Sequence, residues 1–322
     1  MKNQMPKHWQ KGGLVPLLLS PASFFYARGT ATRLKKPGYR SKAKIICIGN
    51  VTAGGAGKTP TAIAVAQTLQ RMGKNVHFIT TGYGRKTEHL SPIRVKGQPA
   101  DEIGDEPLLL AQIAPTWVGD SRELMAKQAE KAGAEIIIMD DGFQNPEVEK
   151  DFSIIVVDGG YGFGNGKVIP SGPLREPVQN ALARADAIMV IGNLKKPLPE
   201  FSLPVFSAKM EIEIPEILQD ESVVAFCGIG RPEKFFDSLR DNGVKLVEEL
   251  AFPDHHYYNE TDFKAIFGIA NSDQAVIVTT EKDMVKVPER FRKIIYPIKA
   301  HLEIEDEEEL AQLITKKLKY EA

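Results

Sequence analysis

Short apolar segments alternate with helical patterns over the first two thirds of the chain. The apolar segments lie at 45–48, 75–80, 135–139, 152–158 and 187–191. Between them, residues 60–72 and 124–132 show the apolar spacing of amphipathic helices. Buried strands that alternate with helices are typical of a parallel sheet covered on both faces. We therefore predict an α/β core that binds ligands beyond the carboxyl ends of its strands.

A different pattern occupies the N-terminus, where residues 14–27 read LVPLLLSPASFFYA. Three interpretations compete. A signal peptide is disfavoured by the nucleotide site described below, and a helix packed on the core is the structural alternative. We favour an interfacial helix, whose apolar side chains enter the acyl boundary while basic flanks meet anionic headgroups. Pro16 and Pro21 disfavour a straight spanning helix. The basic flanks are Lys2, Lys7, Lys11, Arg28, Arg33, Lys35 and Lys36.

Composition narrows the class of protein. A length of 322 residues suggests about two domains, and a formal net charge of −1 does not indicate nucleic-acid binding. Cys47 and Cys227 lie in separate apolar runs without a C-x-x-C spacing, which favours buried thiols in a reducing compartment. Nothing approaches the roughly 20 apolar residues of a spanning helix. These features fit a soluble enzyme with an unusual N-terminus.

The most specific motif follows the first apolar segment, where residues 49–60 read GNVTAGGAGKTP. A strand, a glycine-rich turn ending in Gly-Lys-Thr and a helix form the layout of a P-loop. Lys58 would reach the β- and γ-phosphates, and the Thr59 hydroxyl would hold Mg²⁺. Thr52 stands where the strict pattern has glycine, and a turn without a ligand is the alternative interpretation. The expected nucleotide contacts are Thr52, Ala53, Gly54, Gly55, Ala56, Gly57, Lys58 and Thr59.

A second motif follows the apolar run 136–139, which ends in Asp140-Asp141-Gly142. An acid at the end of a buried strand is typical of a Walker-B site, where a carboxylate holds Mg²⁺ directly or through water. Adjacent residues of a continuing strand point to opposite faces, so only one acid need face the metal. A simple Asp-Asp-Gly turn is the alternative.

Two further clusters offer acid–base chemistry. Asp105 and Glu106 open a helical pattern, a place where the helix dipole alone favours acids. His255 and His256 follow Asp254 and precede another helical pattern. The histidines could bind a metal, although no Cys or His elsewhere completes a zinc set, or they could cap the helix.

In their order along the chain, eight strings resemble the tetraacyldisaccharide 4′-kinase family. The resemblance runs from about residue 12 to residue 299. It implies that ATP, with Mg²⁺, phosphorylates the 4′-hydroxyl of a tetraacyldisaccharide 1-phosphate in lipid A biosynthesis. It also implies a peripheral protein on the cytoplasmic face of the bacterial inner membrane, attached through the N-terminal apolar segment. We expect a monomer that binds no nucleic acid. The strings are GNVTAGGAGKTP, GYGR, GDEPLLLA, DDGFQ, PSGPLREP, CGIGRPEKFF, FPDHHYY and TEKD.

The resemblance further implies a P-loop NTPase-like parallel-sheet core domain and a smaller α/β C-terminal domain, joined by a two-stranded linker with the active site in the cleft. We expect the membrane-associated segment and the kinase core at 1–210. The smaller domain, with linker strands and the C-terminal helix, is expected at 211–322. Linker strands are expected at 205–214 and 296–304, and small-domain strands at 223–227, 246–251 and 275–279.

Site residues carry over from the matching motifs. Asp105 matches the proposed general base for the sugar hydroxyl, and His255 matches its partner. Lys58 would assist catalysis at the phosphates. Phosphoryl transfer relies mainly on positioning and charge neutralisation, so an oriented carboxylate is a suitable group to align the hydroxyl.

The remaining candidates surround the phosphates. Glu106 and Asp141 match acids near Mg²⁺, together with Thr59. Candidates for contacts with phosphate or substrate are Arg122, Gln144 and Arg175. The guanidinium fork suits phosphate, although an ordinary ion pair is the alternative for each arginine. Residues 281–283 receive no role.

Departures from the family pattern occur at two places. Thr81 stands where many relatives have arginine, so any role of that arginine is lost or taken by Arg85. Asn145 stands where a histidine is usual. Neither change removes a residue assigned above.

Two other classes of protein share part of this pattern. A membrane-associated regulatory ATPase of the partitioning or metal-insertion type also pairs a P-loop with a membrane helix. Such proteins usually have lysine before the two glycines, where this chain has Ala53, and a membrane helix at the C-terminus, where residues 306–319 are charged. A nucleotide-binding module without chemistry is the second alternative, against which the clustered acids and His255 argue.

Overall fold

The computed structural model describes residues 6–87 and 91–319. Their strands follow one another in the order β10-β9-β11-β12-β8-β7-β6-β1-β5-β2-β4-β3. The bounds are β1 (Lys44–Gly49), β2 (Val76–Thr80), β3 (Ile93–Arg94), β4 (Thr116–Val118), β5 (Ile136–Asp140), β6 (Phe152–Asp158), β7 (Ala187–Ile191), β8 (Val205–Glu213), β9 (Ser222–Cys227), β10 (Lys245–Ala251), β11 (Val276–Thr280) and β12 (Ile295–Ile304).

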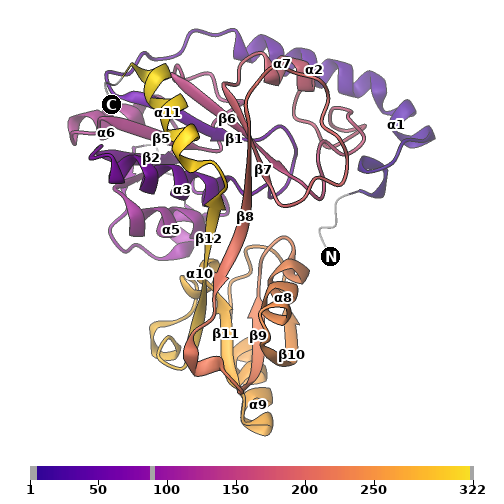
Figure 1. Cartoon of the computed structure of the whole chain (residues 1–322), viewed down its shortest axis with the longest axis vertical. Helices are drawn as coiled ribbons and strands as arrows, with labels where there is room; N and C mark the ends of the chain where they lie inside the picture. Colours follow the sequence, from indigo (N-terminus) through magenta and orange to yellow (C-terminus); the bar gives the residue numbers. More distant parts are fainter. Residues whose placement is uncertain (1–5, 88–90, 320–322) are drawn as a thin grey trace.

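Two lobes share this sheet and are joined by β8 and β12, as Figure 1 shows. The core lobe contains β1–β7 with α1–α7 and α11, and the small lobe contains β9–β11 with α8–α10. The helices are α1 (Leu14–Leu18), α2 (Ser20–Leu34), α3 (Lys58–Arg71), α4 (Ala100–Ile103), α5 (Asp105–Ile113), α6 (Arg122–Lys131), α7 (Val178–Leu182), α8 (Pro232–Asp241), α9 (Glu260–Asp273), α10 (Glu281–Met284) and α11 (Glu307–Leu318). Short 3₁₀ turns occupy Lys7–Trp9, Glu216–Leu218 and Glu289–Phe291.

Strand pairing in the core lobe is parallel, except at the edge strand β3. Apolar side chains on successive strand positions alternate between two hydrophobic clusters, one on each face. Ile136 and Ile138 pack on the face covered by α3, whereas Ile137 and Met139 pack on the opposite face with α6. The predicted α/β class with a parallel core sheet is confirmed.

The strands β8 and β12 connect the lobes as an antiparallel pair, with Ala300 opposite Ile212. One end of β8 pairs with β7 in the core lobe, and one end of β12 pairs with β11 in the small lobe. These strands occupy the stretches expected for the linker. The expected domain boundary between residues 210 and 211 falls inside β8 and stays a prediction.

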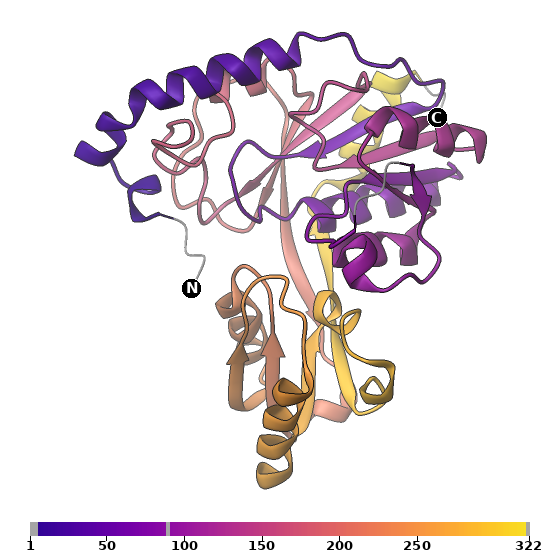
Figure 2. The same cartoon turned by 180° about the vertical axis from the view of Figure 1, so that it is seen from behind.

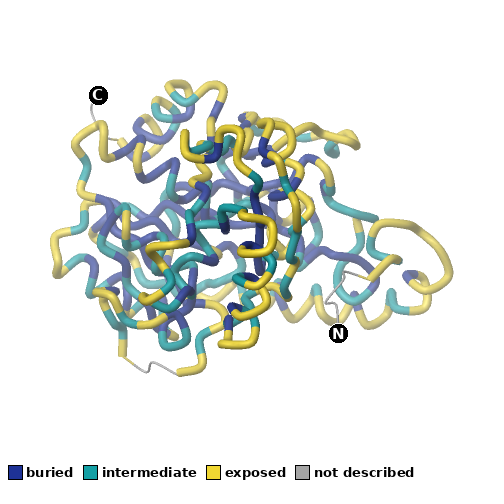
Figure 3. The backbone as a smooth tube through the Cα atoms, turned by 90° about the horizontal axis from the view of Figure 1, so that it is seen from below, coloured by how far each residue is buried: buried dark blue, intermediate teal, exposed yellow. Residues whose placement is uncertain are grey.

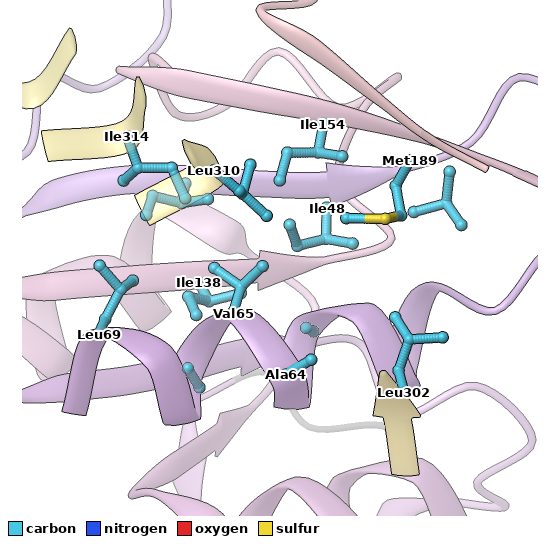
Figure 4. Packing of buried hydrophobic residues seen from close by; sticks show 14 of the residues in the cluster. Ile48, Ala64, Val65, Leu69, Ile138, Ile154, Met189, Leu302, Leu310 and Ile314 are labelled. Carbon is cyan, nitrogen blue, oxygen red and sulfur yellow. The ribbon is translucent and has the colours of Figure 1, made fainter. Parts of the chain in front are cut away.

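The C-terminal helix corrects one expectation. Residues 306–319 were expected as a charged helix of the smaller domain, but α11 packs on the core lobe. Leu310, Ile314 and Leu318 are buried in the same cluster as Ile48 and Ile154 (Figure 4). The physical reason is that β12 returns the chain to the core lobe, where this apolar face of the helix completes one side of the sheet.

The N-terminal segment forms α1 and α2, which lie along one side of the core lobe (Figure 2). Its large apolar side chains point outward: Leu14, Leu18 and Phe25 are 78%, 79% and 72% exposed. Ser23 instead faces the protein, where its hydroxyl donates to the Val168 carbonyl at 2.8 Å. Figure 3 shows the exposure of this segment beside the buried interior. The segment therefore packs on the core lobe through small polar side chains such as Ser23 and leaves its large apolar side chains exposed.

Candidate active site

The glycine-rich loop between β1 and α3 is held by its neighbours. The Asn50 side chain donates to the Thr52 carbonyl at 2.8 Å. The backbone N–H of Ala53 donates to the Pro173 carbonyl at 2.8 Å, and that of Arg175 to the Val51 carbonyl at 2.7 Å. The position at which glycine is usual, Thr52, thus lies in a backbone pairing with the 173–175 segment.

Backbone geometry explains the glycine at the end of the loop. Gly57 has a φ of +92° and precedes α3 directly, in a conformation that side chains other than glycine rarely adopt. The helix then begins at Lys58, so the first backbone N–H groups of α3 have no partner within the helix and point toward the loop. A helix N-terminus after a glycine-rich turn is an anion-binding arrangement.

Lys58 and Thr59 each contact one acid of the Asp140-Asp141 pair. The Thr59 hydroxyl donates to Asp140 Oδ2 at 3.0 Å. The Lys58 ammonium lies 3.7 Å from Asp141 Oδ2. Both acids therefore belong to the site, although the sequence assigned only Asp141.

Backbone conformation brings the two acids to one place. Asp140 is the last residue of β5, and Asp141 has a left-handed φ of +52°. Because the strand ends there, the rule that adjacent residues face opposite sides no longer applies. The Asp141 carboxylate also accepts a hydrogen bond from Arg175 Nη1 at 3.0 Å. Burial raises the pKa of Asp141, but the charges of Lys58 and Arg175 outweigh it, so the net pKa is lowered.

Asp140 is a buried acid with spare binding capacity. Among the described residues, its Oδ1 atom is buried without a hydrogen-bond partner. Burial, followed by the nearby charge of Glu106, raises the pKa of Asp140 to about 7. A carboxylate oxygen left without a partner at this place fits a divalent cation, which would supply the missing positive charge.

The donor set fits Mg²⁺ in particular. Thr59, Asp140 and Asp141 offer hard oxygen ligands, and Glu106 lies close enough to influence Asp140. Within residues 6–87 and 91–319, no three His, Cys, Asp or Glu side chains gather so as to hold a metal by themselves. Proteins usually bind Mg²⁺ through one or two carboxylates together with phosphates and water.

Arg122 lies beneath the acids rather than in open space. It is 2% exposed, and its Nη2 donates to the carbonyls of Asp140 at 3.2 Å and Asp141 at 3.3 Å. Burial lowers the pKa of Arg122, partly offset by the charges of the two acids. In this structure Arg122 thus supports the backbone turn that presents the two carboxylates.

Gln144 and Arg175 line the other side of the loop. The Gln144 amide donates to the Asn50 carbonyl at 2.9 Å and to Glu176 Oε1 at 3.1 Å. Arg175 reaches Asp141, as described above, and is within 3.4 Å of Gln144 Oε1. Gln144 braces the loop, while Arg175 contacts Asp141, the acid that also lies near Lys58.

The second half of the site joins the two lobes. His255, from the small lobe, places Nδ1 at 3.1 and 3.0 Å from the two carboxylate oxygens of Asp105. Asp105 is buried at the start of α5, and His255 has a left-handed φ of +58°. The Tyr83 ring packs edge-on against the imidazole of His255, with the two ring centroids 5.3 Å apart. The structure thus brings together the two residues predicted as base and partner.

Two lysines from the small lobe surround this pair. Lys282 Nζ lies 3.9 Å from Asp105, 3.7 Å from Glu106 and 3.4 Å from His255 Nε2. Lys286 is buried 3.7 Å from Asp105. Burial raises the pKa of Asp105, but the His255 hydrogen bond and the charges of Lys282 and Lys286 outweigh it, so the net pKa is lowered. Asp105 is therefore held in its ionised form, in which both carboxylate oxygens can accept hydrogen bonds.

Sequence reasoning missed Asp140 and the two lysines. Asp140 could have been found, because it continues the face of β5 that Ile136 and Ile138 present to α3, the helix that carries Thr59. No comparable signal marks Lys282 and Lys286, since their proximity to Asp105 depends on how the lobes meet.

The two departures from the family pattern have local partners. Arg85 turns back to the Thr81 carbonyl and forms an ion pair with Asp120. The Asn145 side chain accepts a hydrogen bond from the Glu147 backbone at 2.9 Å. Both residues therefore stabilise nearby turns.

Comparison with known proteins shows the family to which the chain belongs. Residues 15–319 match the family model described as tetraacyldisaccharide-1-P 4′-kinase. The chain is 43% identical over 298 residues to the tetraacyldisaccharide 4′-kinase of Gluconobacter oxydans, and the alignment covers 91% of each chain. It is 46% identical over 293 residues to the tetraacyldisaccharide 4′-kinase of Rhodospirillum rubrum, and this alignment covers 88% of each chain.

A solved structure is similar over nearly the whole chain. It is a crystal structure of LpxK from Aquifex aeolicus in complex with ATP, with a TM-score of 0.78 and 26% identity. The alignment covers 94% of the present chain and 99% of the Aquifex chain.

Proposed function

The chain belongs to the tetraacyldisaccharide-1-P 4′-kinase family, and from this membership we infer that it is a lipid kinase that uses ATP to phosphorylate a lipid A precursor. The acceptor would be the 4′-hydroxyl of a tetraacyldisaccharide 1-phosphate. A regulatory ATPase of the partitioning type is not favoured, because the family match spans almost the whole chain.

We propose that Asp105 is the general base of this reaction. The acceptor oxygen would form a bond to the γ-phosphorus of ATP as the bond from that phosphorus to the bridging oxygen breaks, releasing ADP. The hydroxyl proton would pass to the Asp105 carboxylate. The single observation that carries this proposal is the contact of His255 Nδ1 with both Asp105 oxygens, which fixes the orientation of the carboxylate.

The loop residues would bind and orient the nucleotide. Backbone N–H groups from Gly54 to Thr59 would surround the phosphates, and the Lys58 ammonium would neutralise charge near the γ-phosphate. Thr52 and Ala53, which were also expected as nucleotide contacts, instead pair with the 173–175 segment, where the Ala53 N–H donates to Pro173. Arg175 would add a second cation on the same side. A bound Mg²⁺ would neutralise the charge that develops on the phosphate oxygens, and Thr59, Asp140 and Asp141 would hold it, with Glu106 nearby.

We further propose that the protein attaches peripherally to the cytoplasmic face of the inner membrane. In the part of the chain that the structure describes, no helix has the length and hydropathy to cross a membrane. The support for attachment is the orientation of α1 and α2, which turn Leu14, Leu18 and Phe25 outward. Such side chains could enter the acyl region, where the lipid substrate resides.

Vesicle flotation would test attachment. The Leu18→Glu/Phe25→Glu protein should no longer float with vesicles that contain anionic lipids. The Leu194→Glu protein is the matched control, because Leu194 is an exposed apolar residue elsewhere on the core lobe. Equal flotation of both variants would contradict the proposed attachment surface.

A turnover assay with and without detergent-dispersed tetraacyldisaccharide 1-phosphate would test the activity. Phosphate from ATP should appear on the 4′ position of the sugar. A rate of ATP hydrolysis per protein molecule that does not depend on the lipid but rises with protein concentration would instead support a dimeric regulatory ATPase.

A further inference from the structure

The two lobes meet through polar contacts. Each of the five hydrophobic clusters of the described chain lies on one side of the linker, with β8 and β12 contributing different halves to different clusters. One polar contact is the group around Asp105 and His255, beside which the Tyr257 hydroxyl donates to the backbone carbonyls of Gly84 and Ala100. A second lies at Asp158, at the carboxyl end of β6. Apolar packing therefore does not fix how the lobes are oriented.

Asp158 accepts two cations from the small lobe. Its Oδ2 atom lies 2.8 Å from Arg231 Nη1 and 2.8 Å from Lys234 Nζ. The other oxygen, Oδ1, accepts a hydrogen bond from the Tyr161 backbone at 3.0 Å, which directs Oδ2 toward the small lobe. The Asp158 side chain is 9% exposed and that of Arg231 is 32% exposed, so this pair is better shielded from solvent than an ordinary surface ion pair, whereas the Lys234 side chain is 58% exposed.

An acid opposite these cations stabilises their placement. Arg231 is the N-cap of α8 and Lys234 lies in its first turn, where the helix dipole disfavours positive charge. Asp158 compensates both side chains and also faces the positive end of the helix. Because the compensating acid belongs to the other lobe, this pairing depends on the lobes being together.

The two contacts lie on opposite sides of the glycine-rich loop. In the sheet order β6-β1-β5-β2, the loop follows β1, Asp158 ends β6, and α5 with Asp105 packs on the β2 and β4 side. One contact would leave the small lobe free to twist about its two-stranded linker. Two contacts on either side of the loop define its orientation.

We propose that Asp158, Arg231 and Lys234 form a clasp that positions the small lobe so that His255 meets Asp105. These three are positioning residues, since they act on the reaction through His255. The inference rests on the proposed function only for its kinetic consequence, because the clasp itself is a statement about lobe orientation.

The distance between the lobes tests the clasp without an activity assay. Spin labels at Asn271→Cys in the small lobe and Glu308→Cys in the core lobe report it, since both positions are exposed and the native Cys47 and Cys227 are buried. Double electron–electron resonance should give a narrow distance distribution for the parent protein. Asp158→Asn should broaden it.

Kinetics test whether the clasp positions His255. Asp158→Asn should lower kcat by up to about 10²-fold, the loss that a misplacement of about 1 Å causes. The KM for ATP should stay within about twofold, because the glycine-rich loop is untouched. The Arg231→Gln/Lys234→Gln protein removes the same contact from the other lobe and should behave alike.

A charge exchange and a matched control complete the design. Asp158→Lys combined with Arg231→Glu and Lys234→Gln should restore much of kcat and narrow the distance distribution. Asp237→Asn removes a carboxylate that pairs within α8, with Arg240, and should change neither measurement. The proposal is overturned if Asp158→Asn leaves the distance distribution unchanged, broadens it without lowering kcat, or is not rescued by the exchange. A parent protein without lipid kinase activity would refute the proposed function, while the distances would still decide the clasp.

Discussion

Replacing Asp140 with asparagine should stabilise the protein in the absence of nucleotide and metal. The pKa of this carboxyl is raised from 3.8 to about 7 by burial and by Glu106, so the folded chain holds a proton that the unfolded chain releases above its ordinary pKa. The free energy of unfolding therefore falls as pH rises from about 3.8 to about 7, by about 1.36 kcal/mol per pH unit, and is flat above. The whole window amounts to about 4 kcal/mol. Asparagine keeps a polar partner for Thr59 without the buried charge.

Urea unfolding of the two proteins at about pH 5.5 and about pH 8.5 would measure the effect. The free energy of unfolding of Asp140→Asn relative to the parent protein should rise by about 2 kcal/mol between these conditions. The reason is that about one and a half pH units, from about pH 5.5 to about pH 7, lie inside the range over which the parent protein loses stability. Asp141→Asn is the informative neighbour, because the pKa of Asp141 is lowered and its charge stabilises the fold above that pKa. It should therefore destabilise at neutral pH. The reasoning is refuted if Asp140→Asn is no more stable than the parent protein at about pH 8.5, or if its advantage does not depend on pH.

Two further substitutions test the architecture. Leu310→Ala should destabilise the core lobe by about 2–5 kcal/mol, because this α11 side chain is 2% exposed in the core cluster. Glu308→Ala, on the exposed face of α11, should change the free energy of unfolding by no more than about 0.5 kcal/mol. Equal urea midpoints for the two proteins would exclude the core position of α11. Gly82→Ala should destabilise the protein by more than about 1 kcal/mol, since Gly82 has a φ of +65° and an added Cβ would lie 2.2 Å from the Ile103 carbonyl oxygen. An unchanged thermal unfolding temperature would contradict this.

The local parts of the site could be predicted from the sequence. The strand before Gly49, the glycine-rich loop and the helix from Lys58 follow from short-range patterns, and each element lies within a few residues of its expected range. The pairing of Asp105 with His255 came from the family resemblance, because no local pattern relates residues that are 150 positions apart. The two-residue periodicity of β5 places Asp140 on the same face as Ile136 and Ile138, the face that α3 covers.

Other features depend on tertiary structure. The position of α11 was wrong in the sequence-based division because chain order places it after the small lobe, whereas β12 carries it back to the core lobe. Arg122 looked like a phosphate ligand by residue type, but its burial beneath Asp140 could not be read from a helix start. The contacts of Lys282 and the clasp at Asp158 arise where two lobes meet, and no sequence spacing encodes that geometry.

Asp105→Ala tests the central claim most directly, with lipid phosphorylation and ATP affinity measured on the same protein. If Asp105 accepts the proton of the acceptor hydroxyl, turnover should fall by about 10²–10⁴-fold while ATP binding in the presence of Mg²⁺ stays close to that of the parent protein. A loss of ATP affinity equal to the loss of turnover would contradict this role and would place Asp105 among the groups that hold the metal.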